Sequence, residues 1–267
     1  MVTTATGADR IAAAFHDHGK RAALMPYLMG GYPDLATSRD AGLAAADAGA
    51  DLVELGIPFS DPLADGPVIH AAAVDALAGG VTPHGVLSEV CAPLAERLPV
   101  VLMVYANVVL AGGAERFVER AAAAGASGLI VPDLPHDEAA ALLAACDTAG
   151  LALVPLVAPT STDERVRAVG ADARGFVYAV SLTGTTGERN ALPPGLAEAV
   201  ERVRAATDVP VAVGFGISTG EQAAAVAELA DGVIVGSRIV RAAGEGGADA
   251  VRAVVGELAA ALAASGG

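Results

Sequence analysis

The sequence predicts an α/β protein in which residues 1–267 form one closed (β/α)8 barrel of the TIM type, with an extra helix at 7–18 that covers the barrel bottom. Eight short apolar runs alternate with eight longer Ala-rich runs of helical character. Eight strand–helix units in series within about 250 residues are typical of a closed parallel barrel. The length of 267 residues suits a single unit of this kind.

The predicted strands are short and almost wholly apolar, as expected for strands that are buried on both faces. In chain order they cover residues 22–29, 51–56, 100–105, 127–131, 152–156, 175–180, 210–213 and 232–235. An open doubly wound sheet is the alternative, but it usually has fewer strands and a Gly-rich first turn. Here the first strand leads into Gly30-Gly31-Tyr32-Pro33-Asp34, which is not a dinucleotide fingerprint.

The predicted helices lie between these strands. They cover residues 35–48, 83–97, 113–124, 136–149, 162–170, 194–206, 219–229 and 248–264. Helix start signals stand at Thr82-Pro83, Ser161-Thr162-Asp163 and Ser218-Thr219. Three glycines, Gly49, Gly125 and Gly150, are expected to end helices in the left-handed conformation.

Composition excludes several classes of protein. Hydrophobic residues make up 54% of the chain and charged residues 18%, which excludes intrinsic disorder. The net charge of −15 argues against nucleic acid or an anionic membrane as a partner. No apolar stretch approaches the ~18 residues of a membrane span, and the first residues do not resemble a signal peptide. A cytoplasmic protein is therefore expected.

The rare residues argue against lysine and metal chemistry. The one lysine, Lys20, precedes the first strand, whereas a Schiff-base lysine must lie among the core strands. His16 and His18 are close in sequence, but residues two apart on a helix do not share a face, and zinc sites need three or four ligands. Cys91 and Cys146 are too far apart for a metal motif or a disulfide framework. We expect no metal and no cofactor.

Glycine-containing turns follow the last three predicted strands and predict a phosphate site. They occur in Gly184-Thr185-Thr186-Gly187, Gly214-Phe215-Gly216 and Gly236-Ser237. Glycines let backbone N–H groups approach an anion, and Gly236-Ser237 can begin a helix whose N-terminus favours phosphate. The alternative is that each glycine serves a tight turn, but barrel phosphate sites commonly use these last loops.

A single carboxylate, Glu54, stands in the second predicted strand. Strand alternation places Leu52, Glu54 and Gly56 on one face, and burial among apolar side chains should raise the pKa of Glu54 and suit it to proton transfer. The alternative is a structural glutamate paired with an arginine. The loop that follows carries Asp61 and Asp65, either as turn residues or as the second member of an acid–base pair.

The segment 49–69, GADLVELGIPFSDPLADGPVI, resembles the signature of the tryptophan synthase α subunit family. Further matches fall in the family's order and spacing over residues 8–262. They are Pro26-Tyr27 through Gly31-Tyr32-Pro33-Asp34, Tyr105-Ala106-Asn107, Pro132-Asp133-Leu134-Pro135, Ser181 to Gly187, Gly214 to Ser218, and Gly236-Ser237. The resemblance implies cleavage of indole-3-glycerol phosphate to indole and glyceraldehyde 3-phosphate, in the last steps of tryptophan biosynthesis.

The resemblance also assigns roles to residues. It makes Glu54 the group that protonates indole C3 and accepts the hydroxyl proton, and Asp65 the ionised group that hydrogen-bonds the indole N–H. The implied phosphate ligands are Gly187, Gly216, Gly236 and Ser237. The implied indole pocket is Tyr27, Ile69, Met103, Ile130, Tyr178 and Phe215, although Met103 and Ile130 are equally ordinary core residues. Thr186 would support the aspartate when loop six closes.

Three positions depart from the commonest family pattern. Leu182 stands where an arginine often follows the loop-six serine, His70 replaces a frequent glutamine, and Asp75 replaces a frequent arginine. These changes bear on loop closure and subunit contacts.

The family works as an α2β2 complex with a β subunit that holds pyridoxal phosphate, and this implies the same partner here. The surfaces expected to face it are 58–66, 132–135 and loop six.

Two other functions are open on the sequence. Leu182 motivates a catalytically weak subunit that mainly activates its β partner, against which Glu54 and Asp65 argue. A sugar-phosphate isomerase or epimerase of the same architecture would share the phosphate site. An amino-sugar isomerase would need acids at the ends of strands one and five, and the sequence has none there.

Overall fold

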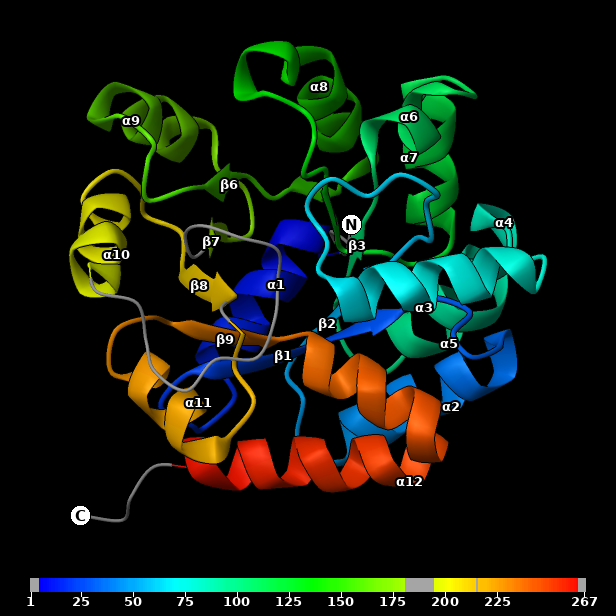
Figure 1. Cartoon of the computed structure of the whole chain (residues 1–267). Coiled ribbons are helices and arrows are strands. Elements are labelled where there is room, and N and C mark those ends of the chain that lie inside the picture. Colours follow the sequence, from blue (N-terminus) through cyan, green and yellow to red (C-terminus); the bar gives the residue numbers. More distant parts are fainter. Residues whose placement is uncertain (1–4, 181–194, 215, 264–267) are drawn as a thin grey trace.

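The protein forms a parallel β-barrel surrounded by helices (Figure 1). The computed structural model describes residues 5–180, 195–214 and 216–263. Its strands are β1(Ala23–Met29), β2(Val53–Gly56), β3(Val100–Met103), β4(Gly128–Ile130), β5(Ala152–Leu153), β6(Leu156–Val157), β7(Val177–Val180), β8(Val211–Gly214) and β9(Gly232–Val235). Every strand pairing is parallel, in the order β5-β4-β3-β2-β1-β9-β8-β7-β6. The α/β barrel predicted from the sequence is confirmed.

The barrel closes through one chain segment, 152–157, which corresponds to the predicted fifth strand, 152–156, and one further residue. Its first half, β5, pairs with β4, and its second half, β6, pairs with β7. Between them Val154 N–H donates to the Leu129 carbonyl (2.8 Å), and Tyr178 N–H donates to the Pro155 carbonyl (2.9 Å). Pro155 has no N–H to donate, so the strand is split into two short ladders.

Most helices lie where the sequence places them. They are α2(Leu35–Asp47), α7(Ala114–Ala123), α8(Ala140–Ala149), α9(Asp163–Asp172), α10(Leu196–Arg204) and α11(Gly220–Ala227). Thr82, Thr162 and Thr219 are N-caps whose side chains accept a backbone N–H, as their start signals indicate. Gly49, Gly125 and Gly150 all have positive φ, so their predicted conformation is confirmed.

Three helical regions differ from the prediction. Residues 83–97 form α4(Pro83–Gly85), a π-helical turn η1(Val86–Cys91) and α5(Ala92–Ala95), and Pro93 cannot donate the bond that a regular helix would need there. A 3-10 turn, η2(His136–Glu138), precedes α8. The predicted helix 248–264 is the second half of α12(Ser237–Leu262), which has non-helical backbone at Gly246 and Gly247.

Two helices were not predicted. They are α3(Pro67–Ala78) and α6(Ala106–Leu110). Helix α3 begins with proline at its first turn, where a missing N–H costs nothing, and buries Ile69, Ala72, Ala73 and Ala76 at helical spacing. The residues before Gly66 are typical of turns, so the sequence indicates a loop up to the residue at which this helix begins.

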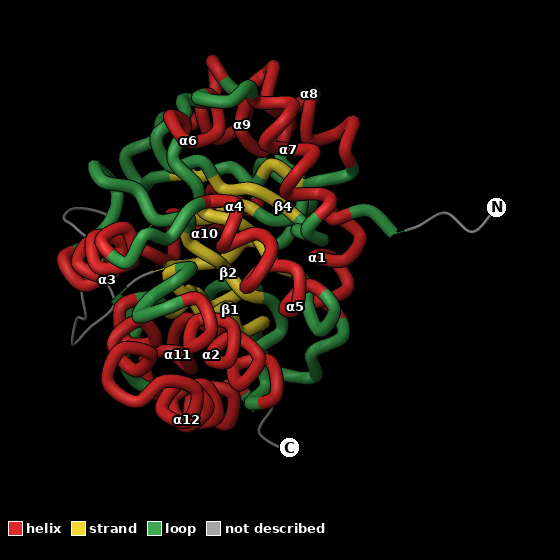
Figure 2. The backbone as a smooth tube through the Cα atoms, turned by 90° about the vertical axis from the view of Figure 1, so that its right-hand side faces the viewer, coloured by secondary structure: helices red, strands yellow, loops and turns green. Residues whose placement is uncertain are grey.

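The N-terminal helix α1(Gly7–His16) lies at the opposite end of the barrel from α3 (Figure 2). Thr6 and Asp9 form a capping box at its start. Ile11 and Phe15 are buried in the inner core cluster, while the Arg10 guanidinium donates to the carbonyls of Ala95, Leu98 and Gly125. Helix α1 therefore packs on the amino-terminal ends of the strands.

The core has two layers. An inner cluster inside the barrel includes Met25, Val101, Ile130 and Phe176. A larger outer cluster lies between the strands and the surrounding helices. No helix in the described part of the chain is long and apolar enough to cross a membrane.

Candidate active site

A cavity of about 90 Å3 opens at the carboxyl ends of the strands. Most of the predicted site residues line it. They are Glu54 and Asp65, the pocket residues Tyr27, Ile69, Met103 and Tyr178, and the phosphate candidates Gly216, Gly236 and Ser237. Residues from six different strands and their loops therefore converge on one space, as is usual for the functional face of a barrel.

Some predicted residues are not brought to this cavity. Ile130 is fully buried and is not among the lining residues, which favours the core role that the sequence left equally open. Thr186, Gly187, Phe215 and Leu182 lie outside the described residues.

The sequence argument missed several lining residues. They are Ala64, Pro132, Leu156, Val180, Gly214, Ile217 and Ile234. Leu156 and Val180 stand at the last inward positions of strands five and six, so strand parity was the signal that could have found them. Apolar residues at these positions shield the carboxylates from water.

Glu54 is held in the middle of the barrel wall. Its Cα pairs with Tyr27 of β1 and with Val101 of β3. The residue is 1% exposed, and its Oε1 has no hydrogen-bond partner among the described residues. Burial, and to a smaller extent the nearby charge of Asp65, raise the pKa of Glu54 to about 8. The arginine partner required by the structural alternative is not found in the described part of the chain.

Two tyrosines flank this carboxyl group, and two glycines make room for them. A Cβ atom at Gly56 would collide with the Tyr27 hydroxyl, and a Cβ atom at Gly214 would collide with the Tyr178 hydroxyl. Burial raises the pKa of both tyrosines, and the two carboxylates raise it further. The tyrosines therefore stay neutral and supply ring surface and hydroxyl groups at the cavity wall.

Asp65 is in the loop after β2 and is half-buried. Burial raises its pKa to about 6, while the Tyr105 hydroxyl and the charge of His70 act to lower it. At pH 7 Asp65 is then mostly ionised and Glu54 mostly protonated. Two carboxyl groups whose environments separate their pKa values can act as acid and as anion in one site.

The buried Glu54 carries a stability cost that depends on pH. Its folded-state pKa is raised, so the protonated form favours folding, and stability is lost as pH rises from 4.5 towards 8. We expect Glu54→Gln to increase the free energy of unfolding at pH 7 by on the order of 3 kcal/mol, because each pKa unit is worth about 1.4 kcal/mol. Urea unfolding at pH 5 to 8 would measure it.

The increase in the free energy of unfolding caused by Glu54→Gln should become smaller as the pH is lowered towards 5. A matched control is Glu257→Gln, because the pKa of Glu257 is lowered by its bond to Arg238. Its substitution should give no gain that grows with pH. An equal gain at pH 5 and pH 8 for Glu54→Gln would contradict the assignment of the cost to ionisation.

The other wall of the cavity suits an anion. Gly236 is the N-cap of α12, and Ser237, 7% exposed, is its first residue. Gly216 has a φ of 37°, which favours glycine. The first N–H groups of a helix lack intrahelical partners and carry partial positive charge. This end of the cavity can therefore hold a phosphate group without a cationic side chain.

A larger groove of about 540 Å3 lies on the side of the barrel, between α8 and α9. It shares only Pro132 and Leu156 with the carboxylate cavity. At its rim His136 Nε2 lies 3.4 Å from Asp172 Oδ2, and Arg165 forms an ion pair with the neighbouring Asp137 (2.7 Å). No group of three or more potential metal ligands occurs in the described ranges. The acid–base pair belongs to the smaller cavity.

Comparison with known proteins gives one consistent answer. The sequence profile of the family described as tryptophan synthase alpha chain matches residues 14–263. A tryptophan synthase alpha chain of Gloeobacter violaceus is 52% identical over 87% of this chain and 84% of its own length. One of Synechococcus elongatus is 47% identical over 92% and 93%, respectively. A structure of Mycobacterium tuberculosis tryptophan synthase superimposes with a TM-score of 0.90 at 42% identity, covering 98% of this chain and 100% of that one.

Proposed function

The chain belongs to the tryptophan synthase alpha chain family, and from that premise we propose that its small cavity cleaves indole-3-glycerol phosphate with Glu54 and Asp65 as the catalytic residues. Family membership makes the chain a lyase of tryptophan biosynthesis. The family's α chain uses no cofactor, and pyridoxal phosphate belongs to the β subunit. The observation that carries the residue assignment is the pair of carboxyl groups in one cavity, with pKa values on either side of 7.

The proposed reaction requires only proton transfer and charge stabilisation. Protonated Glu54 gives its proton to indole C3, which makes the ring an electron acceptor. Ionised Asp65 accepts a hydrogen bond from the indole N–H and stabilises the positive charge on the ring. The Glu54 carboxylate then takes the hydroxyl proton of the side chain. As the carbon–carbon bond breaks, its electron pair returns to the ring and the hydroxyl carbon becomes the aldehyde, so Glu54 ends protonated as it began.

Most of the remaining substrate contacts are assigned to residues that line the cavity. We place the phosphate at Gly216, Gly236 and Ser237, with Gly187 added from the family resemblance, and the indole ring against Tyr27, Ile69, Met103 and Tyr178. Phe215 and Thr186 keep their implied roles as a ring contact and a support for Asp65. The helix N-terminus at Ser237 supports the phosphate end.

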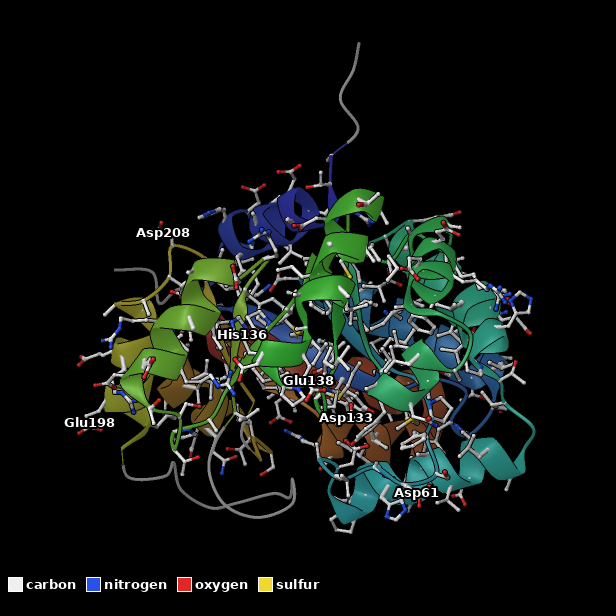
Figure 3. The ribbon with its side chains drawn as sticks, turned by 90° about the horizontal axis from the view of Figure 1, so that it is seen from above. Asp61, Asp133, His136, Glu138, Glu198 and Asp208 are labelled. Carbon is white, nitrogen blue, oxygen red and sulfur yellow. The ribbon has the colours of Figure 1, made fainter. Side chains whose placement is uncertain are left out.

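The β subunit of tryptophan synthase is the partner, in an α2β2 complex, and we propose that segments 58–66 and 132–135 face it, together with loop six. Asp61 and Asp133 lie on the side of the barrel away from α1 (Figure 3). Within segment 58–66 the large apolar side chain of Leu63 is 85% exposed, as a residue of a partner surface would be. We further propose a cytoplasmic location and a single domain over 1–267.

The test is indole release from indole-3-glycerol phosphate by the wild-type chain, with and without a matching β subunit. We expect release that increases when the β subunit is present, because lid closure over the substrate completes such sites. No release from any mixture, with inorganic phosphate still binding, would reject the lyase assignment and favour a subunit that only activates its partner.

A further inference from the structure

The side chain of Tyr105 contacts the Asp65 loop at two separate points. Tyr105 follows β3 and is 3% exposed. The Ala64 N–H donates to its hydroxyl oxygen at 3.1 Å. Its ring stacks on Phe59, with 5.1 Å between centroids and 26° between planes. One side chain therefore braces both ends of the segment that leads from β2 to Asp65.

The hydroxyl group is left with one proton to donate. A tyrosine hydroxyl has a single donor besides its acceptor lone pairs, and Ala64 occupies an acceptor position. Burial and the charge of Asp65 raise the pKa of Tyr105, and the Tyr105 hydroxyl in turn lowers the pKa of the Asp65 carboxyl group, as a proton directed at that carboxylate would. A hydrogen bond to an ionised carboxylate is among the stronger ones in proteins.

The backbone of Tyr105 is itself fixed from a third segment. Tyr105 is the N-cap of α6, and the next residue, Ala106, donates its N–H to Asp133 Oδ1 at 2.8 Å. Asp133 is exposed and follows β4. The bonds from Ala64 to Tyr105 and from Ala106 to Asp133 thus join segments that follow three successive strands.

We propose that Tyr105 is a positioning residue that holds Asp65 in its reactive place and charge state, with Asp133 as the outer support of Tyr105. The proposal rests on the proposed function of Asp65. It concerns the orientation and charge of that carboxylate and not the binding of phosphate, which lies on other loops.

The decisive variant is Tyr105→Phe, which keeps the ring and its stacking and removes only the hydroxyl group. We expect kcat for indole release to fall about 10- to 100-fold, the effect of losing a bond to a charged group. The KM should change little. The acidic limb of the pH profile should move to higher pH, because Asp65 loses a donor that favours its ionised form.

Two controls separate positioning from general structure. Phe59→Leu removes the stacking and keeps the hydroxyl group, so the acidic limb should stay in place. In an Asp65→Asn background, Tyr105→Phe should have little further effect on kcat, because the tyrosine acts through the aspartate. An equal fall in both backgrounds would overturn the proposal.

A measurement that does not depend on catalysis separates the test of this proposal from the test of the proposed function. The pKa of the Asp65 carboxyl can be followed by carbon-13 NMR titration, with Asp65→Asn to assign the signal. It should be higher in Tyr105→Phe than in wild type even if no indole is released. Asp133→Ala should shift it in the same direction by less and serves as the second variant if Tyr105→Phe does not fold. An unchanged pKa in both variants would overturn the proposal.

Discussion

Replacing Glu54 by glutamine is expected to lower indole release from indole-3-glycerol phosphate by about 10²- to 10⁴-fold, the usual effect of removing a general acid–base group. Glutamine keeps the size of the side chain but can neither give a proton to indole C3 nor take one from the hydroxyl group. The effect should appear in kcat, measured by steady-state kinetics of indole formation, because the phosphate contacts lie on other loops.

The pH profile gives a sharper check of the same assignment. Wild-type activity should fall as pH rises through about 8, where buried Glu54 loses its proton, and as pH falls through about 6, where Asp65 gains one. Such a bell shape reports the pair of coupled groups. Glu54→Asp keeps an acid and should retain more activity than Glu54→Gln. Equal activity in wild type and Glu54→Gln would show that the proton comes from another group.

Asp65→Asn is expected to reduce indole release by about 10²- to 10³-fold, as loss of a preorganised electrostatic contact does in other enzymes. A neutral amide can still accept the indole N–H, but it cannot stabilise the positive charge that forms when C3 is protonated. The measurement is kcat and KM for indole formation, with binding of inorganic phosphate measured separately and expected to be unchanged.

A matched control lies four residues away in the same loop. Asp61 is exposed, and its carboxylate accepts a hydrogen bond from the Ser60 hydroxyl, so it does not face the cavity. Asp61→Asn should leave indole release by the isolated chain within about twofold of wild type, the scale expected of a surface change. If both variants lost activity equally, the cause would be loop structure and not the charge of Asp65.

The barrel was predictable because its strands have a simple period. Runs such as 100–103 and 232–235 are apolar on both faces, and only a sheet covered by helices can bury them. The position of Glu54 followed from the same alternation, since Leu52 and Gly56 share its face. Local signals were therefore enough for the strands, for most helices and for one carboxylate.

Features that depend on distant contacts were not predictable. Helix α3 was hidden because its first residue, Pro67, continues a run of turn residues, and its burial is decided by α12 and β1. Ile130 and Leu156 are both apolar and near strand ends, and only the stagger of the barrel decides which reaches the cavity. The bond from Ala64 to Tyr105 joins residues 41 positions apart, and no local pattern encodes it.

The close approach of a tyrosine to a glycine, at Gly56 and again at Gly214, limits which residues the wall beside Glu54 can accept. At Gly56 and Gly214 any added Cβ atom meets a tyrosine hydroxyl and ring carbon. A larger residue at either glycine therefore requires the facing tyrosine to move away from its place at the cavity wall. The size of the cavity beside Glu54 is in this way coupled to two positions that bear no functional group.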